Sequence, residues 1–148
     1  MKDMIARIRG YMYILKCRMI KKNASIGIGL KLYCKLEIEG KGRVTIGKNC
    51  VVSGIIGDKR HYVTIYTHSP GAVVSVGDNA KLFAARISSK FEVRIGDNLL
   101  MEQSGIMDTD FHLIRLDRGQ PSESQEKCRV QIGDRVAIGA RSIVCKGV

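Results

Sequence analysis

The sequence is poor in aromatic residues, proline and long apolar runs. It has no tryptophan and only two prolines in 148 residues, against 16 glycines. This balance favours tight, repeated turns over a bundle of helices. No apolar run is long enough to span a bilayer, and basic residues interrupt the early apolar stretch, so no signal-peptide core is visible. We expect one cytoplasmic domain of ordinary size.

Cysteine is present, but not in a pattern that builds a disulfide framework or a zinc knuckle. There are five cysteines, an odd number, and no Cys-x-x-Cys occurs. Reduced cysteines are the simplest account. Cys50 and Cys145 fall inside a repeat described below, and we expect both to pack there as small apolar residues.

Acidic residues are scarce, so the chain carries a formal net charge of +11. A nucleotide cofactor, an anionic membrane face and nucleic acid are all compatible with this charge, and so is simple solubility. The basic residues are concentrated in residues 1–22 without an aromatic platform beside them. We therefore expect no specific nucleic-acid partner.

Residues 1–22 have the period of a basic amphipathic helix. An apolar stripe steps by three or four residues through Met4, Ile8, Met12, Leu15 and Met19. Such a helix can lie on an anionic membrane surface. It can also pack on its own domain or on a neighbouring subunit, which is favoured because apolar helix faces usually bury against protein.

One short phrase recurs along the rest of the chain: an aliphatic residue, glycine, aspartate or lysine, and then asparagine or a substitute. It begins at residues 46, 76, 95 and 132. A repeat of this kind predicts stacked coils of parallel strand, each too small to bury its own apolar face. The aliphatic residues expected to point inward are Ile46, Val52, Val76, Leu82, Ile95, Met101, Ile132, Ile138 and Val144. Their sixfold spacing argues against the alternative, hairpin turns in an antiparallel sandwich.

Two stretches interrupt this period. Residues 57–71 fit it poorly and are expected to form an irregular coil or small loop. Residues 113–129 are polar, lack the phrase, and predict an excursion loop of the kind that often lines a functional site. The predicted organisation is a helix over 1–22 and a β-helix domain over 23–148.

A carboxylate and histidine cluster stands just before the second interruption. If the segment is extended, Asp108, Asp110 and His112 project on one side. A carboxylate beside an imidazole fixes its tautomer, which suits a general base acting on a hydroxyl. Taken alone, the pattern equally describes a surface histidine paired with a neighbouring acid.

The order of these features resembles the hexapeptide-repeat acyltransferases over roughly residues 24–148. The nearest likenesses are the galactoside, maltose and serine O-acetyltransferases and the acetyltransferases of exopolysaccharide clusters. The likeness rests on the Asp-Thr-Asp-Phe-His run at 108–112 and on Ile-Gly-x-x-Val-x-Ile-Gly-Ala at 132–140. It implies a left-handed parallel β-helix, a homotrimer with active sites between subunits, acetyl-CoA as acyl donor, a sugar or glycan acceptor and no metal.

The resemblance also implies roles for particular residues. His112 would take the proton of the acceptor hydroxyl, oriented by Asp110 as first choice and Asp108 as second. Pantetheine would lie along Gly139 and Ala140. The basic residues placed to meet the CoA phosphates are Arg141 and Lys146.

The chain departs from the family pattern at three places. Leu82 stands where an acceptor-binding asparagine is usual, Ala137 replaces a common tryptophan, and the repeat stops at Val148, so we expect a chain truncated at its C-terminus. A non-catalytic scaffold or trimerisation protein is therefore the alternative. A zinc enzyme like the γ-class carbonic anhydrases would have to use His61, His68 and His112, whose spacing does not suit it.

Overall fold

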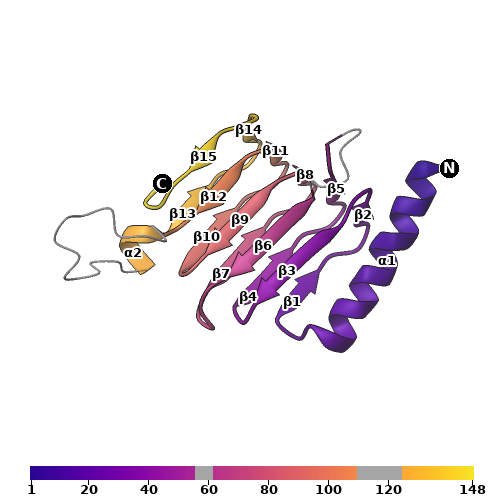
Figure 1. Ribbon diagram of the computed structural model, residues 1–148, viewed down its shortest axis with the longest axis horizontal. Coiled ribbons are helices and arrows are strands. Elements are labelled where there is room, and N and C mark those ends of the chain that lie inside the picture. Colours follow the sequence, from indigo (N-terminus) through magenta and orange to yellow (C-terminus); the bar gives the residue numbers. More distant parts are fainter. Residues whose placement is uncertain (56–61, 110–124) are drawn as a thin grey trace.

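The computed structural model describes residues 1–55, 62–109 and 125–148, and within them it forms a prism of three parallel sheets (Figure 1). The first sheet contains β1 (Ala24–Ile26), β4 (Arg43–Ile46), β7 (Val73–Val76), β10 (Glu92–Ile95) and β13 (Val130–Ile132). The second contains β2 (Lys31–Leu32), β5 (Val51–Ser53), β8 (Lys81–Phe83), β11 (Leu100–Glu102) and β14 (Ala137–Ile138). The third contains β3 (Leu36–Gly40), β6 (Val63–Thr67), β9 (Arg86–Ser89), β12 (Gly105–Met107) and β15 (Ile143–Val144).

Successive strands visit the three sheets in turn, so three strands make one coil and five coils stack. Each strand pairs in parallel with the equivalent strand of the next coil. Ala24 pairs with Val44 and Val74 pairs with Val93, so an uninterrupted coil takes 20 or 19 residues. The predicted parallel β-helix is confirmed, and the antiparallel sandwich is wrong for the described strands. Left-handedness remains a prediction.

The repeated phrase forms the corner between the first and second sheets. Its fourth residue lies in the left-handed region of backbone space in every coil, with φ of 57° to 59° at Asn49, Asn79, Asn98 and Arg135 and 82° at Gly29. Asparagine and glycine tolerate this region better than other residues. The turn geometry therefore accounts for the asparagine of the phrase.

The aspartates of the phrase link one coil to the next along this corner. The backbone N–H of Lys48 donates to Asp78 Oδ1 at 2.7 Å, that of Asp78 to Asp97 Oδ1 at 2.7 Å, and that of Asp97 to Asp134 Oδ1 at 2.8 Å. A Cβ placed on Gly47 would lie 2.4 Å from Asp78 Oδ1. At Gly47, Gly77 and Gly96 the neighbouring coil leaves no room for a side chain, whereas a Cβ on Gly133, in the last coil, would meet nothing within 4 Å.

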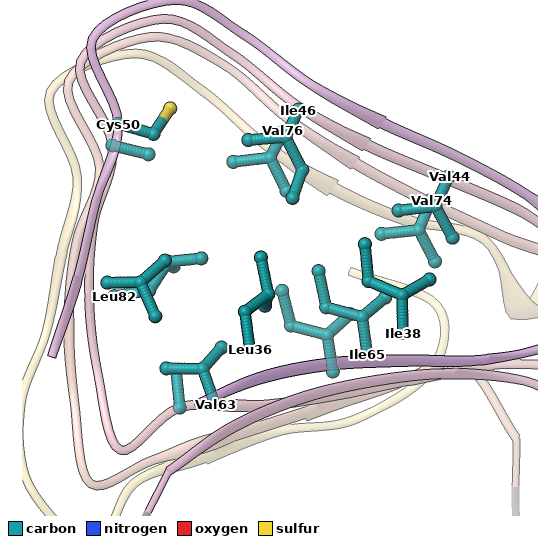
Figure 2. Packing of buried hydrophobic residues seen from close by; sticks show 14 of the residues in the cluster. Leu36, Ile38, Val44, Ile46, Cys50, Val63, Ile65, Val74, Val76 and Leu82 are labelled. Carbon is teal, nitrogen blue, oxygen red and sulfur yellow. The ribbon is translucent and has the colours of Figure 1, made fainter. Parts of the chain in front are cut away.

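The core is a stack of aliphatic side chains inside the coils. Figure 2 shows inward residues from all three sheets, among them Ile46, Leu82 and Ile65, meeting in the enclosed space. Full burial of such a side chain stabilises the fold by about 1.5–3 kcal/mol. All the predicted inward residues belong to this core, with Ile132 and Val144 partly buried at its edge.

The six-residue step is not kept at every corner. Between the second and third sheets it shortens to five residues in two coils, from Leu82 to Ile87 and from Met101 to Ile106. Gln103 closes the second of these tighter turns with φ of 40°. This shortening shifts the sequence pattern out of phase.

The prediction that residues 57–71 are irregular is wrong for their central part. Residues 63–67 form β6, which pairs in register with β3 and β9. The alternation of Val63, Ile65 and Thr67 buries every second side chain, as a strand requires. Residues 56–61 lie outside the described part of the chain, as does most of the predicted excursion over 113–129. A short helix, α2 (Gln125–Cys128), ends that excursion.

Helix α1 (Lys2–Ile20) lies across the end of the stack where the first coil begins (Figure 1). Its buried residues are Ala6, Gly10, Ile14 and Cys17. A Cβ on Gly10 would lie 1.9 Å from the backbone oxygen of Leu30, so the helix backbone touches the coil directly. Packing of the helix on its own domain is confirmed.

The face of α1 that packs is not the apolar stripe. Met4, Ile8, Met12 and Met19 are exposed, and Leu15 is partly buried. Ile14 and three small residues, Ala6, Gly10 and Cys17, make the contact instead, and the small residues allow the helix to approach the coil closely. Among the described residues, no helix has both the length and the hydropathy needed to cross a bilayer.

The cysteines divide into two groups. Cys17, Cys50 and Cys128 are buried and Cys34 is partly buried. The prediction of burial is confirmed for Cys50 and is wrong for Cys145, which is exposed. Cys145 directly follows the inward-facing Val144, so strand alternation turns its side chain outward.

Candidate functional site

Asp108 lies at the corner between the third and first sheets, where β12 ends. Its side chain is fully buried. Oδ1 accepts the backbone N–H of Lys90 at 2.7 Å, and Oδ2 accepts the backbone N–H of Phe91 at 2.9 Å and the hydroxyl of Ser89 at 2.7 Å. The carboxylate thus holds the turn between β9 and β10, and both of its oxygens already have donors.

Asp108 continues a buried polar column along this corner. Ser89 lies next to it and Thr67 one coil further, both buried. The Thr67 hydroxyl accepts the backbone N–H of Gly42 at 3.0 Å and donates to the backbone oxygen of Glu39 at 3.1 Å. Sequence reasoning missed this column.

A readable signal for the column does exist in the sequence. Thr67, Ser89 and Asp108 each follow an inward aliphatic residue by two positions, which places them on the same inward face. The Thr67 hydroxyl and the Asp108 carboxylate accept backbone N–H groups at this corner, and the Ser89 hydroxyl donates to Asp108.

Two of the three predicted catalytic residues, Asp110 and His112, lie outside the described residues. The structure therefore places Asp108 alone from that cluster. Its burial and its three donors give it a structural role in the turn, whether or not it also acts on His112.

Three of the predicted CoA-binding residues, Gly139, Ala140 and Arg141, lie at another corner, between the second and third sheets in the fifth coil, whereas Lys146 follows β15 beyond the third sheet. Gly139, Ala140 and Arg141 are exposed, and Lys146 is partly buried. Arg141 has φ of 64°, and its backbone N–H donates to the backbone oxygen of Gln103 at 3.0 Å. A Cβ on Gly139 would meet nothing within 4 Å among the described atoms, so intrachain packing does not itself require glycine there.

A groove of about 540 Å³ runs over the outer face of the third sheet and connects the two regions. At one end it is lined by Gln103 and Arg141, and at the other by Met107, the residue before Asp108. Its floor is made of small outward residues, Gly105 and Ser88 among them. The strand register places Gly105 between Arg86 and Ile143, which leaves a depression in that row.

The groove carries donors suited to an anionic or carbonyl-bearing ligand. Two arginines, Arg86 and Arg141, are among its lining residues. Ser104 also lines it, and among the described residues its hydroxyl is the buried side-chain polar atom without a hydrogen-bond partner. That hydroxyl oxygen has almost no accessible surface, so it lies beneath the groove and does not face a ligand bound in it.

A histidine that sequence reasoning did not connect with this face borders the groove. His68 Nε2 lies 2.8 Å from Ser88 Oγ, and its ring meets Tyr66 edge-on with centroids 4.4 Å apart. Ser88 and Tyr66 both line the groove. Partial burial lowers the pKa of His68, opposed by the charge of Asp108, so the imidazole is neutral near pH 7 and able to accept a proton.

No local motif indicates the His68–Ser88 pair, because the two residues come from different coils. The pair forms because β6 and β9 are neighbours and place Tyr66 beside Ser88. Stacking of coils, rather than any local motif, brings the imidazole to the groove.

Within residues 1–55, 62–109 and 125–148, no three metal-ligating side chains gather into a group. His68 belongs to the described residues, whereas His61 and His112 do not. The three-histidine zinc site considered above therefore has one member on the described surface.

Comparison with known proteins gave no match to a family model, to a curated protein or to a solved structure.

Proposed function

We propose that this chain is an acetyl-CoA-dependent O-acetyltransferase that acetylates a sugar hydroxyl. The observation that carries the proposal is the groove on the third sheet. One of its ends holds Arg141, from the expected CoA strip, and the other reaches Met107, next to the segment that contains His112. Donor site and general base would then share one surface.

The groove chemistry supports an acyl-CoA ligand in particular. Arginine is well suited to phosphate groups because its guanidinium forms paired, charge-assisted hydrogen bonds. Arg141 and Arg86 supply two such groups at the groove.

The proposed reaction is a direct transfer. The imidazole of His112 takes the proton of the acceptor hydroxyl while its oxygen attacks the thioester carbonyl of acetyl-CoA. A tetrahedral intermediate then breaks the C–S bond, and the imidazolium returns the proton to the leaving thiolate. The products are an acetyl ester and CoA, with no acyl-enzyme.

The described imidazole of His68 provides a second candidate for the base, because it is neutral near pH 7 and borders the groove. It is held by Ser88 Oγ at 2.8 Å, and this hydroxyl could be displaced by that of an acceptor. His112 remains the first choice because the resemblance assigns it the role.

The test is transfer of labelled acetyl from acetyl-CoA to a panel of sugars and glycans by the native chain, His112→Ala and His68→Ala. We expect His112→Ala to lose at least about a hundredfold in turnover, while His68→Ala keeps most of the activity. Loss in His68→Ala alone would transfer the role of base to His68. Full activity of both variants would refute base catalysis by His112 and by His68.

Assembly is part of the proposal, since the resemblance implies a homotrimer with sites between subunits. Sedimentation analysis should give a trimer. A trimer that neither binds acetyl-CoA nor transfers acetyl would instead support the non-catalytic scaffold.

A further inference from the structure

Helix α1 presents its apolar stripe to solvent. The exposed fractions are 60% for Met4, 56% for Ile8, 60% for Met12 and 78% for Met19. Eight of the thirteen large apolar side chains that are exposed among the described residues lie within residues 1–20. Single exposed apolar residues are ordinary, but a contiguous row of them marks an interaction surface.

The stripe lies on the side of α1 opposite to the coil. Two positions on an α-helix correspond to a rotation of about 200°. Ile8 follows the buried Ala6 by two positions, and Met12 follows the buried Gly10 in the same way. Packing on the coil therefore fixes the direction in which the stripe faces, which is away from the protein.

Basic side chains border the stripe on both sides. Lys2, Arg9 and Lys16 recur every seven residues along one border, and all are exposed. Arg7 and Arg18, also exposed, lie on the other border. The geometry is that of a helix lying in a membrane interface, with an apolar face between cationic flanks.

The one acidic residue of the helix is turned away from this surface. Asp3 accepts from Arg7 Nε at 2.9 Å, from Lys31 Nζ at 3.0 Å and from the Tyr33 hydroxyl. The Tyr33 hydroxyl, followed by Lys31 and Arg7, holds the pKa of this carboxyl well below its usual range. Asp3 thus attaches α1 to the first coil.

We infer that α1 docks this protein onto an anionic membrane surface, with the helix axis in the plane of the bilayer. Nineteen residues give a helix about 28 Å long that can lie along the headgroup region. Two copies meeting through this face would bring their cationic borders together, which is unfavourable. An anionic lipid surface offers an apolar region for the stripe and negative headgroups for the basic residues that border it.

The surroundings of α1 fit this orientation. A groove of about 520 Å³ opens between the helix and the first coil, lined by Arg7, Tyr11 and Arg18 and by the exposed Ile28. The coils extend away from α1 (Figure 1), so docking leaves the sheets and the groove on the third sheet uncovered. This inference rests on α1 alone and is independent of the proposed transferase activity.

The test is sedimentation of the full chain with vesicles of phosphatidylcholine plus phosphatidylglycerol, and with vesicles of phosphatidylcholine alone. We expect binding to the first vesicles only, weakened by added salt. Ile8→Glu combined with Met12→Glu should bind at least about tenfold more weakly, because the stripe enters the apolar boundary. Both side chains are exposed, so thermal unfolding should not change.

Two double variants with the same change in net charge distinguish an effect of the basic border of α1 from an effect of net charge alone. Arg9→Glu with Lys16→Glu should weaken binding at least about tenfold, since each basic residue near the surface contributes about 1 kcal/mol, or a factor of about five. Lys41→Glu with Lys81→Glu, exposed positions on the coils, changes the net charge equally and should have a much smaller effect. Equal effects of the two pairs, or unchanged binding in the stripe variant, would overturn the inference. A change in oligomeric state of the stripe variant without loss of vesicle binding would assign the stripe to a protein interface instead.

Discussion

Replacing Asp108 should destabilise the fold, because its carboxylate is the acceptor for three groups at one corner. In Asp108→Ala the backbone N–H groups of Lys90 and Phe91 and the hydroxyl of Ser89 lose their acceptor. An unsatisfied buried donor costs about 1–3 kcal/mol. The turn is only part-buried and water can reach some of these donors, so we expect a loss of about 3–5 kcal/mol in the free energy of unfolding.

The loss should appear as a lower melting temperature. For a domain of this size, 1 kcal/mol corresponds to about 2–4 °C, so Asp108→Ala should melt roughly 6–20 °C below the native chain. Asp108→Asn keeps one acceptor oxygen but turns an amide N–H₂ toward a backbone donor. Its melting temperature should therefore lie between those of Asp108→Ala and the native chain. Ser89→Ala removes one donor from the carboxylate and should cost about 1 kcal/mol.

Thermal and urea unfolding followed by circular dichroism measure this series directly. A loss below about 0.5 kcal/mol in Asp108→Ala would refute the structural role assigned to the carboxylate. If stability is unchanged while acetyl transfer falls, Asp108 acts on His112 and not on the turn. If these hydrogen bonds hold the turn, the loss in the free energy of unfolding should be largest in Asp108→Ala, smaller in Asp108→Asn and smallest in Ser89→Ala.

Three further predictions concern other parts of the molecule. Gly10→Ala should lower the free energy of unfolding by about 1–3 kcal/mol, because the added Cβ meets the backbone of Leu30. Unchanged stability in a thermal melt would contradict the packing of α1. Thiol labelling of the native chain should modify the exposed Cys145 first and leave Cys50, whose pKa burial raises to about 11, unmodified until unfolding; early labelling of Cys50 would contradict the core. Because burial lowers the pKa of His68 in the folded state, its contribution to stability is present above the unfolded pKa of about 6.5 and is lost as pH falls through the folded pKa. A histidine titration by NMR with a midpoint above 6.5 would contradict that environment.

The architecture was readable from the sequence because each coil repeats the same physical requirement. The φ of the fourth phrase residue favours asparagine or glycine, although Arg135 adopts it in the last coil, and the closeness of the next coil requires glycine at positions 47, 77 and 96. Because every coil has these requirements, the same residue types recur at the same spacing in the sequence. Ile26, Leu32 and Ile38 keep the six-residue step in the first coil too, although its phrase has lost both the aspartate and the asparagine.

The parts that could not be predicted depend on contacts between coils. β6 was mistaken for an irregular segment because the insertion before it and the five-residue steps elsewhere break the period. The face of α1 that packs on the coil could not be predicted either, because helical periodicity identifies an apolar stripe but does not show which side of the helix contacts the domain. Gly10 and Ala6 look unremarkable in sequence, yet they make the contact. The groove, Ser104 and the His68–Ser88 pair arise only when strands from separate coils are neighbours.

Calorimetric titration of the full chain with acetyl-CoA would show whether the groove of the third sheet is a donor site. Arg141→Ala serves as the groove variant and Arg43→Ala, at the start of β4 in the first sheet, as the control. We predict saturable binding to the native chain and to the control, and binding at least about tenfold weaker in Arg141→Ala, the loss expected for one arginine–phosphate contact. Absence of binding to the native chain, or equal affinity in all three proteins, would contradict the claim.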